Sequence, residues 1–286
     1  MIIFLIETNK EDGNGCCKTN IAWPGARAGG EHFIDYLSKA IFAEYERAGA
    51  VDAVTADWKL RGGCTVMATL IIGDRLEVVA VGDSGVRING TDVLQVLKPL
   101  DDVTAIMRRE TWRYFEALGE DPATCDKLAG AITWRGTRHQ EPNSRSGDVH
   151  IVAEIEGRSL AACKQHLPDV PENEILRLIH GGICFAQGDF QNVTEPVLGY
   201  GGLDGFGVPA RYIETRSYAL QDIETIELFS DGYFKLGEEF GVASWEAAFA
   251  EVEAEDFHKI GRYMSTKGTT DVMLTDDRTY LGVRLK

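Results

Sequence analysis

Four aspartates stand next to predicted strands, where their carboxylates could hold a metal ion. Asp12 follows the first apolar run, Asp83 closes a later strand, Asp231 ends the run "IELF", and Asp276 precedes the last strand. Aspartate is depleted in strands, and a buried carboxylate is costly unless it is paired or metal-bound. Mg²⁺ and Mn²⁺ prefer carboxylate, carbonyl and water oxygens, so these acids are candidate ligands. Taken singly, each is better explained as a solvated turn residue, because aspartate is common in turns.

The segments that would position these acids show clear hydrophobic periodicity. Residues 2–6 predict an edge or entry strand, 31–48 and 101–118 predict amphipathic helices, and 279–285 predict a terminal strand. Residues 66–72 and 76–82 alternate, with turn signals at 73–74 and 89–90, which predicts a three-stranded antiparallel meander. The remaining expected elements are an alternating stretch at 149–155, a helix at 172–179, a loop and candidate lid at 199–209, two alternating segments within 210–229, and helices at 244–255 and 257–264.

Helices and antiparallel strands in clustered runs, without regular βαβ alternation, predict an α+β layered sandwich. The chain of 286 residues is 44% hydrophobic and carries no linker or repeat, so we expect one domain over residues 1–286. The early and late strands must pair with each other, because neither set alone can cover its apolar face.

Charge and cysteine usage narrow the function classes. A formal charge of −16 and a pI near 4.8 argue against nucleic-acid and anionic-membrane partners, which require clustered lysine and arginine. No apolar stretch approaches about 18 residues and no export signal is evident, so we expect a soluble, cytoplasmic protein. The six cysteines lack a C-x-x-C pair, which favours reduced thiols over a zinc site or disulfides.

The order of three segments resembles a known family. "GGCTVMATLIIGDRLEVVAVGDSGVRI", "IELFSDGYFK" and "TDDRTYLGVRL" are similar to the G-[ST]-T-A strand, V-G-D-S-R hairpin, L-x-S-D-G and D-[DN]-x-T motifs of the metal-dependent serine/threonine protein phosphatases of the 2C type, the PPM family. The resemblance extends from about residue 8 to residue 285. Each motif alone is weak, but their order and separations are specific.

This resemblance implies a four-layer α-β-β-α sandwich of two antiparallel sheets flanked by helices. It implies a site for one or two Mn²⁺ or Mg²⁺ ions held by Asp12, the carbonyl of Gly25, Asp231 and Asp276. In the family, such ions activate a water that hydrolyses phosphoserine or phosphothreonine of a phosphoprotein substrate. Asp83 matches a position that we expect to be mainly structural.

Several positions depart from the family pattern. Pro24 replaces the aspartate that bridges both ions, and losing that negative charge should lower occupancy of at least one site. Val96 replaces an aspartate that helps to bind a third ion, and Glu7 stands where many members have a phosphate-binding arginine. Asn14 occupies the place of a histidine proposed as the general acid in some members.

The sequence therefore leaves open two main functions. One is a divergent metal-dependent protein phosphatase, which strand-tip acids favour; the other is a catalytically weak or inactive pseudophosphatase that acts as a binding or regulatory module, which Pro24 and Val96 favour. A third reading, an N-terminal-nucleophile hydrolase exposing Cys16 or Cys17, has no downstream support.

Overall fold

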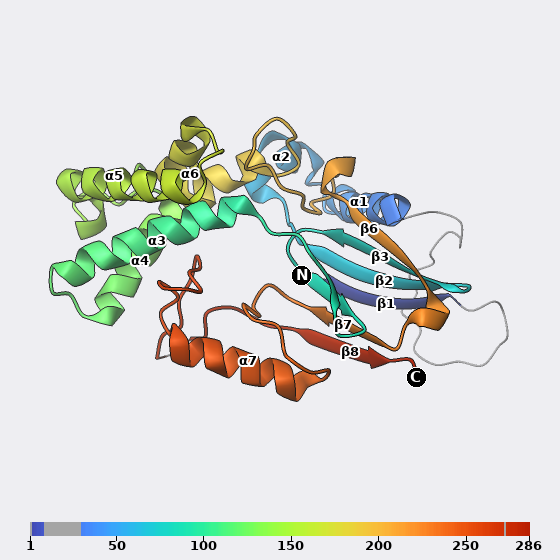
Figure 1. Cartoon of the computed structure of the whole chain (residues 1–286). Helices are drawn as coiled ribbons and strands as arrows, with labels where there is room; N and C mark the ends of the chain where they lie inside the picture. Colours follow the sequence, from blue (N-terminus) through green and yellow to red (C-terminus); the bar gives the residue numbers. More distant parts are fainter. Residues whose placement is uncertain (1, 9–29, 272) are drawn as a thin grey trace. The chain divides into compact units, whose positions relative to one another are not determined.

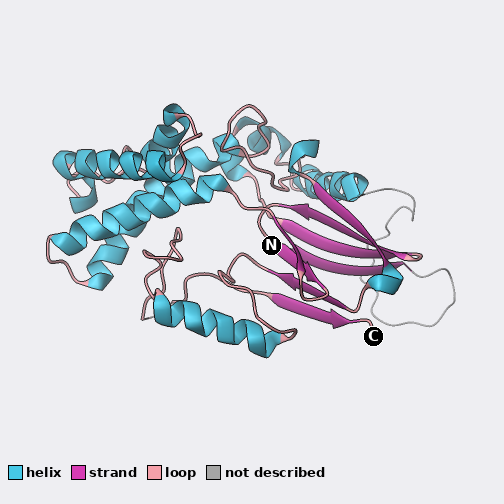
Figure 2. Cartoon of the chain, viewed as in Figure 1, coloured by secondary structure: helices cyan, strands magenta, loops and turns pink. Residues whose placement is uncertain are grey.

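Two four-stranded sheets are assembled from segments far apart in the chain. In this computed structural model, which describes residues 2–8, 30–271 and 273–286, the first sheet has the order β1-β2-β3-β6 and the second β5-β4-β7-β8 (Figure 1). The strands are β1 Ile2–Thr8, β2 Val66–Ile72, β3 Arg75–Val81, β4 Gly85–Ile88, β5 Asp92–Gln95, β6 Glu214–Ala219, β7 Thr225–Phe229 and β8 Tyr280–Arg284. Helices account for most of the remaining regular structure (Figure 2), which confirms the expected α+β class.

One strand pair departs from the expected antiparallel arrangement. β1 runs parallel to β2, with Ile2 opposite Val66 and Thr8 opposite Ile72, whereas the other strand pairs are antiparallel. Parallel neighbours need a crossover rather than a tight turn, and the chain between β1 and β2 contains helix α1, Gly30–Arg47. The edge position predicted for the first strand is confirmed.

The chain divides into two compact units that interleave in sequence. The sheet unit comprises Met1–Val96, Gly201–Ser230 and Tyr280–Lys286, and the helical unit comprises Leu97–Tyr200 and Asp231–Thr279. The chain therefore passes from one unit to the other four times, at 96–97, 200–201, 230–231 and 279–280. The expectation of one domain over residues 1–286 stays a prediction.

The predicted three-stranded meander is wrong beyond its second strand. β2 and β3 form the expected hairpin, but the chain then leaves the first sheet, and β4 pairs with β5 and β7 in the second. Gly82 lies at this change of sheet with φ +89°, and a methyl group on it would lie 2.3 Å from Cγ2 of Thr65. Glycine alone adopts such a conformation at so close an approach without strain, so the alternating pattern ends here.

The core of the sheet unit lies between the two sheets. Alternate residues of each sheet point inward, as period-two strands require. The buried inner residues are Met67, Leu76, Val78 and Ala80 from the first sheet and Val86, Ile88, Leu94, Ile226 and Leu228 from the second, with Ile223.

Helix α1 covers the other face of the first sheet. Phe33, Ile34 and Leu37 are buried in a cluster with strand residues such as Val66 and Val79. Full burial of a side chain such as Phe33 contributes about 1.5–3 kcal/mol. The predicted amphipathic helix is thus confirmed, and the sheet unit has helix, sheet and sheet in three successive layers. Figure 1 shows α1 beside this sheet.

A buried ion pair joins β4 to β7. Arg87 is directly opposite Glu227, and its Nε donates to Oε2 of Glu227 at 2.6 Å, with side chains 4% and 0% exposed. The hydroxyl of Tyr280, in β8, donates to the other carboxylate oxygen at 2.8 Å. These charges lie on the face opposite Val86 and Leu228, so the central strands β4 and β7 are buried on both faces, whereas the edge strands β5 and β8 are partly exposed.

The candidate lid is fastened to the sheet unit over residues 201–206. Leu203 exchanges two backbone hydrogen bonds of 2.9 Å with Cys64. Asp204 accepts a hydrogen bond of 3.1 Å from Arg61, whose guanidinium lies 3.8 Å from the ring centroid of Phe206. These contacts anchor the segment rather than leaving it free to close over a site.

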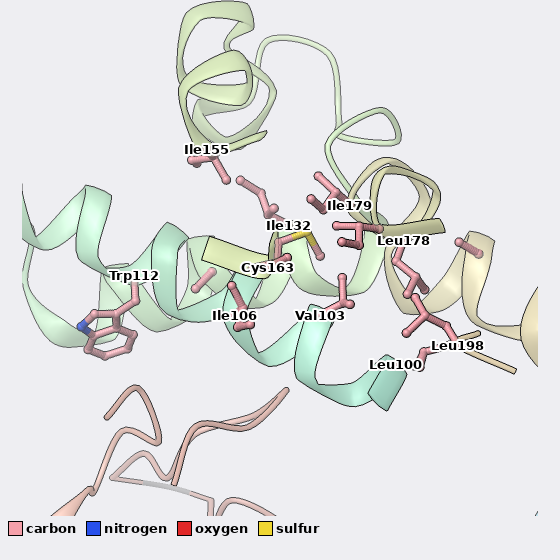
Figure 3. Packing of buried hydrophobic residues seen from close by; sticks show 14 of the residues in the cluster. Leu100, Val103, Ile106, Trp112, Ile132, Ile155, Cys163, Leu178, Ile179 and Leu198 are labelled. Atoms are coloured by element: carbon pink, nitrogen blue, oxygen red, sulfur yellow. The ribbon is translucent and has the colours of Figure 1, made fainter. Parts of the chain in front are cut away.

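The helical unit is built around one apolar cluster. Figure 3 shows Val103, Ile106, Ile132, Ile155 and Leu178 converging from four helices. The helices of the unit are α3 Pro99–Ala117, α4 Pro122–Arg135, α5 Val149–His166, α6 Glu172–Ala186 and α7 Val242–Glu255, and α2 Val51–Ala56 belongs to the sheet unit. No helix within the described ranges is long and apolar enough to cross a membrane.

Two segments of this unit differ from the predictions. Residues 149–155, which alternate, begin α5, because the carboxylate of Asp148 caps the backbone amides of His150 and Ile151. The helix expected at 257–264 is absent. There the carboxylate of Asp256 accepts hydrogen bonds from the amides of Ile260, Gly261 and Tyr263 and folds the chain into turns instead.

The four cysteines within the described ranges, Cys64, Cys125, Cys163 and Cys184, are free thiols. Burial raises the pKa of Cys163 to about 12. None of these four is joined in a disulfide, and the expectation of reduced thiols in a reducing compartment stays a prediction.

Candidate active site

Asp231 stands at the surface directly after a buried strand. The last four residues of β7 are buried, Ser230 is 2% exposed, and Asp231 is exposed. Gly232 and Tyr233 then turn back into the interior of the helical unit. The strand thus delivers a carboxylate to its tip, as the sequence predicts.

The two acidic motifs of the resemblance meet within the helical unit. A methyl group on Gly232 would lie 2.4 Å from the carbonyl oxygen of Asp277 and 3.2 Å from Cβ of Arg278. No other residue type fits this approach, so Gly232 lets the turn after Asp231 contact the chain after Asp276. Segments about 45 residues apart in sequence are therefore in van der Waals contact.

Glu246 of α7 joins the same two motifs through hydrogen bonds. Its Oε1 accepts from the hydroxyl of Tyr233 at 2.7 Å and from Nε of Arg278 at 3.0 Å, and its Oε2 accepts from Nη2 of Arg278 at 2.6 Å. The Arg278 hydrogen bonds, with that of Tyr233, lower the pKa of Glu246. The Glu246 carboxylate in turn raises the pKa of Arg278. The carboxylate stays ionised at neutral pH and holds both segments.

Aromatic side chains of α7 complete this anchor. The guanidinium of Arg278 lies 3.8 Å from the ring centroid of Phe249, and Tyr233 packs edge-on against buried Trp245 at 5.2 Å between centroids. Such contacts add to apolar burial and fix the orientation of both side chains. Burial, with the hydrogen bond to Glu246, raises the pKa of Tyr233 to about 12.

The segment before Asp276 is closed by a pair of buried threonines. Oγ1 of Thr269 lies 2.6 Å from Oγ1 of Thr275, and the amide of Thr275 donates to Oγ1 of Thr269 at 3.1 Å. The two residues are 3% and 1% exposed. Since the clamp joins positions six apart, Lys267 and Asp276 stand close to the two ends of the loop that it closes.

Lys267 forms an ion pair with Asp276. Its Nζ lies 3.2 Å from Oδ1 of Asp276, and the two side chains are 38% and 31% exposed. The amide of Asp277 donates to the same oxygen at 3.0 Å. The pair borders a cavity of about 700 Å³ lined by Glu246, Lys267, Met273, Leu274, Thr275, Asp276, Asp277 and Arg278, and Asp231 is not among them.

The position of Lys267 is fixed by its neighbour in sequence. Gly268 is packed so closely that a methyl group on it would lie 2.2 Å from Nη2 of Arg108 and 2.4 Å from the carbonyl oxygen of His258. Arg108 is 1% exposed and donates to that carbonyl at 2.8 Å and to Asp126 at 2.7 Å. The backbone beside Lys267 therefore rests on a buried arginine of α3.

The described residues offer the right type of ligand atom for a divalent ion, but too few of them to form a complete site. Asp231 and Asp276 offer the carboxylate oxygens that Mn²⁺ and Mg²⁺ prefer. Within the described ranges, however, no group of three or more histidine, cysteine, aspartate or glutamate side chains is placed to hold a metal. The other predicted ligands, Asp12 and the carbonyl of Gly25, lie outside the described residues.

The remaining positions from the sequence comparison are divided between the units. Asp83 is buried where the chain changes sheets in the sheet unit, and its carbonyl oxygen accepts a hydrogen bond of 3.0 Å from Gln95. Val96 follows β5 in the same unit, and Glu7 lies opposite Ile71 in the first sheet. Pro24 and Asn14 lie outside the described residues.

Searches of protein-family models, of curated proteins and of solved structures found no match to this chain.

Three residues of this site were missed by the sequence reasoning. Glu246 is one of several acids on the helix 242–255, and nothing in its spacing distinguishes it. Arg278 stands two positions after Asp276, but an arginine near an aspartate is common on any surface. Lys267 lies nine positions before Asp276, and no sequence pattern connects the two. Only the folded chain shows that these cations contact the acids.

Proposed function

We propose that the chain is a divergent metal-dependent phosphatase that hydrolyses phosphoserine or phosphothreonine in a partner protein. The observation that carries the proposal is the approach of Gly232 to the carbonyl oxygen of Asp277. It brings together the S-D-G and D-D-x-T segments, which the resemblance to PPM phosphatases requires to share one site. The proposal includes a cytoplasmic location, in keeping with the free cysteines of the described residues.

In this proposal, Asp231 and Asp276 hold Mn²⁺ or Mg²⁺ together with Asp12 and the carbonyl of Gly25. Bound ions supply activation of water and neutralisation of charge on the phosphate oxygens. Water adds to phosphorus as the bond from phosphorus to the serine or threonine oxygen breaks, and the products are inorganic phosphate and the free hydroxyl. Glu246 is a positioning residue in this proposal: it does not bind the metal, but it holds the two segments that carry Asp231 and Asp276.

The test joins Mn²⁺ titration by calorimetry to p-nitrophenyl phosphate hydrolysis in one buffer. We expect the wild type to bind Mn²⁺ and to turn over only with metal, and Asp231→Asn to lose at least about a hundredfold in metal-dependent rate. Asp169→Asn, an exposed acid in the helical unit, serves as the matched control and should keep wild-type activity. Equal activity of the wild type and Asp231→Asn would refute this site.

A specific observation favours the second candidate, a pseudophosphatase that binds a partner without turnover. The ammonium of Lys267 already neutralises Asp276, and Pro24 cannot supply the family's bridging carboxylate. This candidate predicts that wild type binds no Mn²⁺ and hydrolyses no p-nitrophenyl phosphate, yet stays folded. The same titration therefore separates the two candidates.

A further inference from the structure

The contact between Lys267 and Asp276 is supported by the backbone around it, which buried groups hold in place. Thr269 and Thr275 clamp the loop from inside the protein, and Gly268 is seated on Arg108. The backbone on both sides of the ion pair is thus held by buried groups. A long lysine side chain loses rotamer freedom in such a pair, and a fixed backbone reduces the additional cost of forming it.

A divalent ion that binds Asp276 is repelled by the positive charge of the Lys267 ammonium. Nζ of Lys267 lies 3.2 Å from Oδ1, which is within the first layer of atoms around the carboxylate. An ion coordinated by the same group would lie a few ångströms from a positive charge unless the lysine moved away. The repulsion between a dication and an ammonium at that distance, even with water-like screening, corresponds to roughly a tenfold loss of affinity.

The cavity beside the ion pair provides space into which the Lys267 side chain can move. Lys267 and Asp276 both line the space of about 700 Å³, and each side chain is about one-third exposed. The ammonium can therefore exchange Asp276 for water without leaving a buried charge unpaired. By contrast, the neighbouring Arg278 is engaged by two hydrogen bonds to Glu246 and by Phe249. Of these two cavity-lining cations, Lys267 is the one free to be displaced.

We propose that Lys267 is a tethered counter-cation of Asp276 that competes with divalent metal for this carboxylate and so lowers the metal affinity of the site. The inference rests on the proposed function, because it assumes that Asp276 is a metal ligand. On this inference, two features lower the metal occupancy of the site: the positive charge of Lys267 and the lack of a carboxylate at Pro24.

The first test compares Mn²⁺ affinity, measured by calorimetry and by the electron paramagnetic resonance signal of free Mn²⁺, among wild type and three variants. Lys267→Met removes the charge and keeps most of the length, and should bind Mn²⁺ roughly tenfold more tightly. Lys267→Arg keeps the charge and should bind as wild type does. Lys235→Met, which breaks the exposed pair with Glu251 in the same unit, should also match wild type.

The outcomes distinguish this inference from the proposed function. Equal, measurable Mn²⁺ affinity for wild type and Lys267→Met overturns the competition and leaves the metal-dependent function standing. Absence of Mn²⁺ binding in both overturns the metal site, and the competition with it. Tighter binding by Lys267→Met alone supports the competition, including the case in which wild type binds too weakly to detect.

A second measurement uses the wild-type protein and does not depend on how a variant folds. Mn²⁺ should displace Lys267 from Asp276 and raise its rate of acetylation by an N-hydroxysuccinimide ester, read by peptide mass spectrometry. Lys235 is the internal reference, because its partner Glu251 lies outside the site. A Mn²⁺-independent ratio of the two acetylation rates, under conditions in which Mn²⁺ is shown to bind, overturns the competition.

Discussion

The hydroxyl of Tyr233 and the guanidinium of Arg278 donate to the same oxygen of Glu246, at 2.7 and 3.0 Å. One residue belongs to the S-D-G segment and the other to the D-D-x-T segment, so a single carboxylate on α7 holds both acidic motifs in place. The candidate ligands Asp231 and Asp276 are therefore positioned by a residue of α7 that belongs to neither motif.

The shared carboxylate of Glu246 should contribute measurably to stability. Glu246→Gln removes the charge that pairs with Arg278, and we expect a loss of about 1 kcal/mol in unfolding free energy, the upper range for a partly exposed pair. Urea denaturation measures it. Glu251→Gln, which breaks an exposed pair on the same helix, should change stability by less than about 0.5 kcal/mol. Equal losses in both variants would contradict a special role for Glu246.

The effect of Glu246 should also depend on pH with a definite sign. Since the folded state lowers the pKa of this carboxyl, its contribution is complete above the ordinary value, about 4.3, and is lost as the pH falls through the folded pKa. The stability difference between wild type and Glu246→Gln should therefore be constant from pH 5 to 7 and shrink in more acidic buffer. A difference that grows on acidification would reverse the assignment.

The phenol of Tyr233 offers a spectroscopic prediction. Its pKa is raised to about 12, so the folded state keeps the proton that an unfolded chain releases near 10. The resulting stabilisation is complete below about pH 10 and disappears as the pH rises through 12. In an absorbance titration at 295 nm, Tyr233→Phe should remove a component that ionises near pH 12. An unchanged high-pH component would place that tyrosine elsewhere.

A pair of glycine substitutions tests the contact between the motifs. Gly232→Ala would put a methyl group 2.4 Å from a backbone oxygen, so the segments must separate, and we expect a loss of about 2 kcal/mol or more in stability. Gly157 is exposed in α5 with nothing within 4 Å of a new methyl group, and Gly157→Ala should stabilise the protein by about 0.5–1 kcal/mol. Thermal denaturation of the two variants should shift in opposite directions.

The ion pair of the second sheet gives a prediction for the sheet unit. Glu227→Gln leaves Arg87 buried beside a neutral group, which should cost about 3–5 kcal/mol. Replacing both residues, as Arg87→Met with Glu227→Leu, removes the uncompensated charge and should recover most of that loss. Chemical denaturation of the single and double variants measures the difference. A double variant no more stable than the single would show that the loss does not arise from unpaired charge.

Local periodicity predicted those elements whose one face is apolar. The helix Gly30–Arg47 and the strands Val66–Ile72 and Tyr280–Arg284 agree with the patterns at 31–48, 66–72 and 279–285. Predictions from periodicity were wrong where a polar side chain forms hydrogen bonds with the backbone. The caps at Asp148 and the turns around Asp256 decide those segments, and their effect depends on hydrogen bonds that an alternation of apolar residues does not report.

The candidate site was predictable only in part, for a different reason. The strand-end position of Asp231 follows from the length of the apolar run before it. Its association with the segment of Asp276 depends on Gly232, Glu246 and the packing of α7, which are tertiary features. Lys267 could not be assigned as a partner of Asp276 without the threonine clamp that brings the loop ends together.

The interleaving of the two units has a consequence for how the chain folds. β4 and β7 pair residues 140 positions apart, as Arg87 and Glu227 show, so the second sheet forms only after a long loop has closed. Most of that loop is the segment 97–200, whose helices contact one another over short sequence separations and form early. Once folded, this segment shortens the loop that remains to be closed. Mutations in the core of α3 to α6 should therefore slow the appearance of the sheets, although no strand contains the altered residue.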